Sequence, residues 1–388
     1  MSDYLCEEIT TNILHRLPVN ALLRCTSVCK SWYNLITTPQ FISYHLNFAA
    51  ARKNKNPFLL LRRCLGNSER YDVFSDNDSF TPHATLEFPF RSINPFFSIV
   101  GSCNGLVCLS DDRVYYTHTI ILWNPCIKKS LILPKPDPIY NSSYGAFAQS
   151  LGFGFDPVAS DYKVIRIISY ADCRPRAGLY KLSTGAWQDL NFLGLECVVY
   201  NKSYQAYVNG ATHWVARYVD FYDVIVFFDM CKEVFGKIML PLSVVNNDNN
   251  RLRTKDLVVY NESLALILWN VSGPEPGFCI WVMKEYGVQE SWTKHMSFDS
   301  RDFGERFMRP LWVRKRGEVI TVWQDGRLVS YGPDGAEEVK DLGVDGSRSE
   351  DHRRRSIRVD SYMESLVLLD KGPSSDVLTS KKLPTLHM

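Results

Sequence analysis

The chain has 388 residues, of which 45% are hydrophobic and 13% aromatic, and its formal net charge at pH 7 is +2. These proportions favour a packed core and exclude a chain that is disordered throughout. Acidic and basic residues are interleaved without a basic stripe, so we expect no nucleic-acid partner.

The amino-terminus and the cysteines indicate the compartment. Met1-Ser2-Asp3-Tyr4 has neither the basic start nor the apolar stretch of a secretory signal. Apolar runs such as residues 224–228 and 264–269 are far shorter than the ~20 residues that a membrane helix needs. The 11 cysteines are an odd number, scattered along the chain, and do not form a disulfide framework. We therefore expect a cytoplasmic and/or nuclear protein without a membrane partner.

The first ~45 residues have the apolar periodicity of helices. Pro18 ends a first run and suits the first turn of a second helix, and a last short turn starts at Phe41. The segment contains more large apolar side chains than a three-helix unit of this size can enclose. The surplus predicts either a surface for a partner or packing of the helices on the rest of the chain.

A turn-and-strand pattern then repeats six times, every ~45–60 residues, which is the interval of a four-stranded propeller blade. Its outer turns are Phe74-Ser75-Asp76-Asn77, Trp123-Asn124-Pro125-Cys126, Leu182-Ser183-Thr184-Gly185, Phe228-Asp229-Met230-Cys231, Met283-Lys284-Glu285-Tyr286 and Tyr331-Gly332-Pro333-Asp334. Its inner strand pairs are expected at residues 101–109, 151–168, 205–216, 256–269, 311–323 and 357–369. Asn104-Gly105 and Asn209-Gly210 supply the residues that tight turns with positive φ favour.

The two ends of this array are out of phase. The first outer segment, residues 58–90, has no inner pair before it, and the last inner pair, residues 357–369, has no outer segment after it. Closing the array into a ring removes its free sheet edges. We therefore predict a closed six-bladed β-propeller whose final blade contains both ends. The sequence leaves open whether residues 57–64 add a strand to that blade.

The fold class is thus α+β, mainly β: a three-helix module followed by a closed six-bladed β-propeller. We expect the module at residues 1–46, a linker at 47–56, the propeller at 57–370 and a disordered tail at 371–388.

The loops of such blades divide between two faces. The tight turns share one face, and the long, irregular loops share the other, where recognition usually occurs. Aromatic and arginine side chains, which anchor protein interfaces, occur in these long loops. Alternatively, such aromatic residues cap the edges of blades. The candidate target-binding residues are Tyr140, Tyr144, Arg174, Arg176, Tyr218, Phe221, Tyr222, Phe303 and Arg306.

Motifs for catalysis or metal binding are incomplete. Gly152 and Gly154 lack the third glycine and the strand–turn–helix setting of a dinucleotide site. Asp76-Asn77-Asp78 begins like a calcium loop, but Phe80 stands where the next oxygen ligand belongs. We expect no catalytic residue, no metal site and no cofactor.

The amino-terminal segment closely resembles the F-box. The residues that carry the resemblance are Leu5, Ile13-Leu14, Arg16-Leu17-Pro18-Val19, Leu22-Leu23-Arg24, Val28-Cys29-Lys30-Ser31-Trp32, Leu35-Ile36, Pro39 and Phe41. The resemblance implies docking on the Skp adaptor, which bridges to a cullin scaffold and its ubiquitin-conjugating enzyme. The adaptor-binding residues that it implies are Leu5, Cys6, Ile9, Leu17, Pro18, Leu22, Leu23, Val28 and Trp32. The family's Leu-Pro opening is Leu5-Cys6 here, and the lost proline predicts weaker docking.

The repeat region resembles the F-box-associated, kelch-like domain of plant F-box proteins. The similar stretches are residues 101–109, 121–125, 151–156, 161–164, 180–187, 208–210, 213–214 and 362–367, and residues 361–370 are similar to the S-locus F-box-like branch. The paired glycines of a kelch blade are absent.

Together the resemblances imply a non-catalytic substrate receptor of an SCF-type (Skp-cullin-F-box) ubiquitin ligase. The helical module would bind the Skp adaptor and through it cullin, and the propeller loops would bind an unknown target protein. The alternatives are a scaffold or decoy outside the ligase, or a propeller enzyme acting on small molecules.

Overall fold

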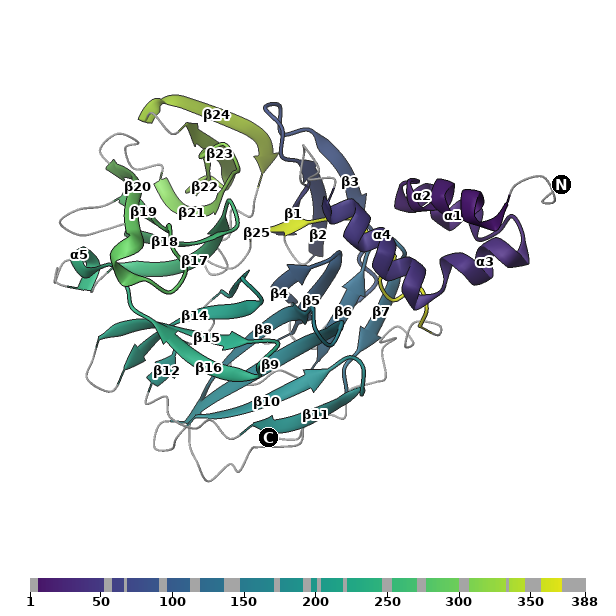
Figure 1. The fold of residues 1–388 in the computed structure, drawn as a ribbon. Helices are drawn as coiled ribbons and strands as arrows, with labels where there is room; N and C mark the ends of the chain where they lie inside the picture. Colours follow the sequence, from purple (N-terminus) through teal and green to yellow (C-terminus); the bar gives the residue numbers. More distant parts are fainter. Residues whose placement is uncertain are drawn as a thin grey trace, which may run out of the picture.

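The computed structural model describes residues 6–51, 58–65, 68–90, 96–111, 119–135, 147–170, 175–190, 197–200, 204–218, 222–245, 253–270, 277–299, 307–332, 335–345 and 357–371. In these residues, four helices lead into a ring of six antiparallel sheets, and the helices project from one side of the ring (Figure 1). None of the described helices is long and apolar enough to cross a membrane.

The helical module comprises α1 (Glu7–His15), α2 (Val19–Cys25), α3 (Lys30–Ile36) and α4 (Pro39–Ala51). Prolines begin two of these helices: Pro18 precedes α2 with a φ of −67°, and Pro39 is the first residue of α4. The acidic Glu7 and Glu8 lie in the first turn of α1, where the helix dipole favours negative charge.

The module is longer than the three-helix unit that we expected. The turn at Phe41 continues as a helix of 13 residues, so the first part of the expected linker at 47–56 is helical as far as Ala51. The reason is a continuing apolar stripe: Phe41, Ile42 and Leu46 are all buried on the side of α4 that faces the core.

The six sheets are the six predicted blades, and they occupy the ring in chain order. Blade 1 contains β4 (Ser98–Cys103), β5 (Leu106–Ser110), β6 (Ile120–Asn124) and β7 (Lys129–Ile132); blade 2 contains β8 (Phe147–Asp156), β9 (Asp161–Tyr170), β10 (Arg176–Lys181) and β11 (Ala186–Leu190). Blade 3 contains β12 (Cys197–Val199), β13 (Ala206–Val208), β14 (Ala211–Tyr218), β15 (Asp223–Asp229) and β16 (Val234–Ile238). Blade 4 contains β17 (Thr254–Tyr260), β18 (Ser263–Asn270), β19 (Gly277–Met283) and β20 (Trp292–Asp299); blade 5 contains β21 (Phe307–Val313), β22 (Val319–Trp323), β23 (Arg327–Gly332) and β24 (Gly335–Asp345). The short helix α5 (Leu242–Val245) and a 3₁₀ helix (Gln289–Ser291) lie in connections.

The sixth sheet, the closing blade, contains both ends of the array, as predicted. Its strand order is β25 (Ile357–Tyr362), β1 (Phe58–Leu65), β2 (Ser68–Ser75) and β3 (Pro82–Leu86). The register runs from Phe58 opposite Tyr362 to Arg63 opposite Ile357. The ring is therefore closed by backbone pairing between the two ends of the array.

One expectation for the closing blade is wrong. Residues 357–369 do not form a strand pair, because only β25 joins the sheet and β1 supplies the second strand. After Tyr362 the chain leaves the sheet, since the carbonyl groups of Ser365 and Val367 accept hydrogen bonds from the side chain of Asn124 instead of a neighbouring strand. Leu368 has a φ of 74°, which is incompatible with a continuing strand.

Buried polar contacts join neighbouring blades. Trp214 in blade 3 donates from Nε1 to the carbonyl of Leu151 in blade 2 at 2.9 Å. Arg314, after β21, pairs through Nε with Asp76 of the closing blade at 2.6 Å, and both side chains are buried. These contacts satisfy polar groups that would otherwise be costly in the core.

Lys163 forms a buried charged contact between blades 2 and 3. Its Nζ lies 2.7 Å from Asp156, 2.7 Å from Glu233 and 2.6 Å from the carbonyl oxygen of Met230, and its side chain is 2% exposed. We expect Lys163→Met to lower the unfolding free energy by about 3–5 kcal/mol, because it leaves a buried carboxylate unpaired. Urea denaturation measures the change. Lys232→Met is the control, since Lys232 is 76% exposed and should contribute little; equal losses in both variants would contradict the prediction.

The same contact gives the stability a pH dependence. Burial alone would raise the pKa of Asp156, but hydrogen bonds from Lys163 and from two backbone N–H groups outweigh burial and lower that pKa. Because the pKa is lower in the folded chain, the contribution is present above the unfolded value of about 4 and is lost as the pH falls through the folded value. Lys163→Met should therefore flatten the loss of stability that occurs as the pH falls below about 4, which urea denaturation at a series of pH values measures.

Candidate interaction surfaces

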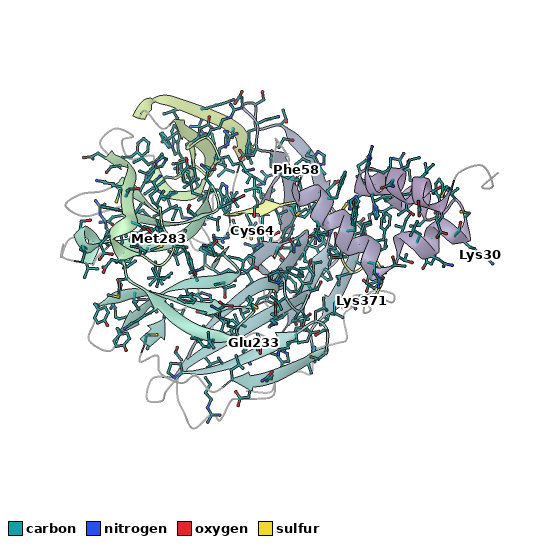
Figure 2. All side chains as sticks on the ribbon, in the orientation of Figure 1. Lys30, Phe58, Cys64, Glu233, Met283 and Lys371 are labelled. Carbon is teal, nitrogen blue, oxygen red and sulfur yellow. The ribbon has the colours of Figure 1, made fainter. Side chains whose placement is uncertain are left out.

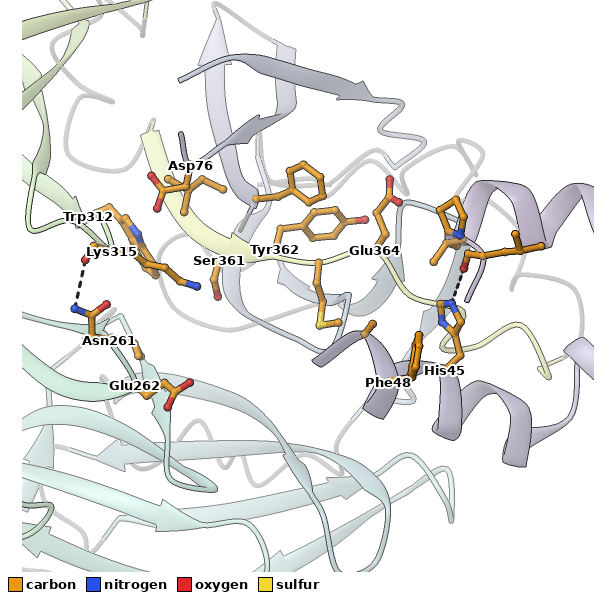
Figure 3. A pocket seen from close by; sticks show the side chains of 18 of the residues that line it. His45, Phe48, Asp76, Asn261, Glu262, Trp312, Lys315, Ser361, Tyr362 and Glu364 are labelled. Atoms are coloured by element: carbon orange, nitrogen blue, oxygen red, sulfur yellow. Dashed lines mark hydrogen bonds between the residues drawn. The ribbon is translucent and has the colours of Figure 1, made fainter. Parts of the chain in front are cut away.

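The helical module lies against the face of the propeller that carries the tight turns. A cleft of about 990 Å³ lies between them. His45 and Phe48 line it from α4, and Asp76, Asn261 and Lys315 line it from tight turns of three blades (Figure 3). The ends of the strands that carry the predicted target-binding loops therefore lie on the opposite face.

Large apolar side chains are exposed on the module. Ile9 is 50% exposed and Val28 is 64% exposed, and Ile13, Tyr33 and Tyr44 are exposed to similar degrees. Of the eleven large hydrophobic side chains that are exposed in the described residues, five lie on this small module. Clusters of this kind mark surfaces for partners. The far end of the module, at Lys30, lies well away from the propeller (Figure 2).

The predicted adaptor-binding residues occupy different depths in the module. Leu5 lies outside the described residues; Cys6, Ile9, Pro18 and Val28 are exposed, Leu17, Leu23 and Trp32 are half-buried, and Leu22 is buried. Leu22 belongs to the same core cluster as Leu14 and Ile36, so its side chain packs inside the protein and holds α2 in place. Ile13 was not among the predicted residues, although its spacing of four from Ile9 places both on one face of α1.

Six of the predicted target-binding residues (Tyr140, Tyr144, Arg174, Phe221, Phe303 and Arg306) lie outside the described residues. The other three lie at the long-loop face of neighbouring blades: Arg176 begins β10 and is exposed, Tyr218 ends β14, and Tyr222 precedes β15. The rings of Tyr218 and Tyr222 stack with centroids 5.1 Å apart, and Lys237 Nζ lies 5.4 Å from the ring centre of Tyr218. The structure therefore brings two of the predicted residues together.

Buried arginines line the inner strands near the same face. Arg309 on β21 donates from Nη2 to the carbonyl of Ile357 at 2.6 Å, and the guanidinium of Arg358 on β25 lies 4.0 Å from the ring centre of Tyr204. These residues border a cavity of about 10 Å³, room for about one water molecule. Arg309 and Arg358 were not among the predicted contact residues, because those residues were expected in loops and these two lie on strands. Within the described ranges, no three or more His, Cys, Asp or Glu side chains are grouped to hold a metal ion.

Comparison with protein families accounts for both parts of this arrangement. A model of the F-box domain matches residues 3–44, and a model of the F-box associated beta propeller domain matches residues 68–368, more than half of the chain. The chain belongs to the family of F-box proteins with an F-box-associated β-propeller. In this F-box protein the F-box covers α1 to α3 and the start of α4, and α4 continues beyond the matched residues.

Relatives from Arabidopsis thaliana match this chain over most of their length. The F-box protein At3g07870 is 28% identical, with 85% of each chain covered. The F-box/kelch-repeat protein At3g23880 is 26% identical, over 82% of this chain and 85% of the relative. The F-box protein CPR1 is 27% identical, over 84% of this chain and 81% of the relative. This F-box protein is therefore similar to these plant F-box proteins over more than four fifths of its length.

Proposed function

We propose that this F-box protein is the substrate receptor of an SCF-type ubiquitin ligase. Its F-box binds the Skp adaptor and through it cullin, and the long-loop face of the propeller binds a target protein. The observation that carries the proposal is the separation of two surfaces: exposed apolar side chains on the F-box, and a long-loop face on the side of the ring away from it. One chain can then hold both partners at once.

In this proposal the chain performs no covalent chemistry. It holds lysines of the target beside the activated ubiquitin thioester of the conjugating enzyme, so that transfer proceeds at a high effective concentration. Such a receptor acts in the cytoplasm, the nucleus or both.

A scaffold or decoy outside the ligase is the second candidate, and Cys6 is the observation that favours it. Cys6 stands where the family has proline, and it precedes α1 with a φ of −56°. That angle is close to the value that proline fixes. Cys6 therefore keeps the backbone geometry of a proline but lacks the ring that restricts φ. Weaker docking on the adaptor follows if this restriction contributes to binding.

We expect Cys6→Pro to raise the unfolding free energy by about 0.4–1 kcal/mol, because proline restricts the unfolded chain at a φ that the folded chain already adopts. The backbone carbonyl of Cys6, which accepts a hydrogen bond from the N–H of Thr10, is kept. Thermal unfolding and adaptor titration check the change. Cys6→Ala is the control and should have no such effect; a destabilised proline variant would show that this interpretation of the backbone is wrong.

Reconstituted ubiquitin transfer tests the receptor function. The purified chain is mixed with Skp adaptor, cullin, activating and conjugating enzymes and ubiquitin, and conjugates on the chain's own propeller lysines are mapped by mass spectrometry. We expect conjugates with the intact chain and none with a chain that lacks residues 1–46. Conjugates of equal yield without those residues, or none with the folded intact chain, would overturn the proposal in favour of the scaffold.

A further inference from the structure

The described chain ends in a short segment, residues 363–371, that follows β25 and that we name the strap. Ser365 and residues 366–368 are buried. Leu366, Val367 and Leu368 belong to one continuous apolar core that also includes Leu14, Val19 and Leu22 of the F-box, together with side chains of blades 1 and 2. The strap therefore lies where the F-box and the propeller share a core.

The backbone of the strap is bound by side chains of blade 1. Asn124 Nδ2 donates to the carbonyl oxygens of Ser365 and Val367, both at 2.9 Å. Lys129 Nζ donates to the carbonyl oxygen of Leu369 at 3.0 Å and to that of Lys371 at 2.5 Å. Asn124 is fully buried, so these donations are made away from competing water. Four carbonyl groups of the strap are thus held by the two residues that flank the turn between β6 and β7.

The tight turn at Asn104-Gly105 packs against the strap. A Cβ atom on Gly105 would lie 2.3 Å from Ser365 Oγ and 2.8 Å from the carbonyl oxygen of Met363, and Gly105 has a φ of +83°. Glycine is required there both by the backbone and by the strap. Residues 101–109 and 121–125, two stretches that resemble the family, therefore meet at Ser365.

The attachment of the F-box is one-sided. On the strap side the F-box shares a core with blades 1 and 2. On the other side, the cleft of about 990 Å³ separates it from turns of blades 4 and 5 and of the closing blade. Tyr362, the last residue of β25, and Glu364 of the strap line this cleft (Figure 3). An F-box that is held on one side only can pivot if that side is loosened.

We infer that Asn124 is a positioning residue: by holding the strap, it fixes the orientation of the F-box relative to the long-loop face of the propeller. This inference rests on the proposed function, because a fixed orientation is useful when one end holds the ligase and the other holds the target. The orientation of the F-box would then determine which lysines of the target come within reach of the conjugating enzyme.

Hydrogen exchange on the full chain tests the structural part of this inference, which is that Asn124 holds the F-box in place through the strap. In Asn124→Ala we expect the amides of α1, α2 and α4 to exchange about tenfold faster, while strands of blades 3 to 5 keep their protection. Asp229→Ala is the matched control, because Asp229 Oδ1 accepts the N–H groups of Cys231 and Lys232 at the corresponding outer turn of blade 3, away from the strap. Asn124 Oδ1 accepts the N–H of Cys126 in the same way. Equal exchange of α1, α2 and α4 in both variants would overturn the inference.

A second variant covers the case in which Asn124→Ala loses protection throughout the propeller. Lys129→Met removes the hydrogen bonds from Lys129 to the strap and keeps the buried hydrogen bonds from Asn124. We then expect faster exchange in the same helices by a smaller factor, with the propeller strands unchanged. Unchanged exchange in the helices of this folded variant would overturn the inference.

Ubiquitin transfer separates this inference from the proposed function. A variant of Asn124 or Lys129 that binds the adaptor as tightly as the wild-type chain should place ubiquitin on a wider set of propeller lysines than the wild-type chain does. If the helices loosen but the wild-type chain never binds adaptor, the strap is correctly assigned and the proposed function fails. If wild-type transfer occurs and the variants have the same exchange and the same lysine pattern, the strap inference alone fails.

Discussion

A chain that ends at Asp345 is expected to lose its cooperative unfolding transition and to aggregate. It lacks β25, which pairs with β1 along six residues, and it lacks the strap. Without β25 the closing blade loses its inner strand, and β1 has a free edge where the intact chain has backbone hydrogen bonds. Arg309 also loses the carbonyl of Ile357 as its partner.

Urea unfolding monitored by circular dichroism, together with gel filtration, measures this loss. A chain that ends at Lys371 is the matched control, because it keeps β25 and the strap and removes only residues 372–388. We expect the control to unfold as cooperatively as the full chain. A single sharp transition at the same urea concentration in the chain that ends at Asp345 would show that closure does not stabilise the ring.

Replacement of Ile9 and Val28 together by aspartate is expected to weaken adaptor binding by about 100-fold or more. Both side chains are exposed in the free chain, at 50% and 64%, so the replacement leaves the core of the F-box intact. In the complex, each carboxylate would be buried in an apolar interface without a partner. Isothermal titration with purified Skp adaptor measures the affinity.

The control for this prediction is Val158→Asp. Val158 is 81% exposed and lies between β8 and β9 on the propeller, so the same change of chemistry is made outside the proposed interface. We expect it to bind adaptor as the wild-type chain does. If the double variant were to retain full affinity while folded, the exposed apolar surface of the F-box would not be the docking surface.

The ring could be predicted from the sequence because its signals are local and repeated. The positive φ of Asn104, Gly105, Asn209 and Gly210 in the structure matches the turns that these residues indicate. The unmatched segments at the two ends of the array predicted a closed ring, and the pairing of β25 with β1 confirms this prediction. The pattern did not reveal the strap, because an apolar run such as Leu366-Val367-Leu368 has the same appearance in a strand and in a segment covered by helices.

Candidate contact residues were harder to predict than the fold. Leu22 and Val28 belong to one predicted apolar stripe, but Leu22 is buried in α2 and Val28 is exposed in the connection between α2 and α3. Apolar periodicity cannot distinguish buried from exposed side chains when a small module is apolar on two sides. Arg309 and Arg358 were missed for a different reason: the position of a strand residue relative to the channel depends on how six blades close, which is a property of the whole ring.

Size-exclusion chromatography with light scattering, on the purified chain with Skp adaptor and cullin, decides whether this chain is an adaptor-bound receptor. We expect one complex that contains one copy of each protein, and we expect the Ile9→Asp, Val28→Asp variant to elute apart from the adaptor. If the folded wild-type chain elutes apart from the adaptor at micromolar concentrations, the chain is not a ligase receptor.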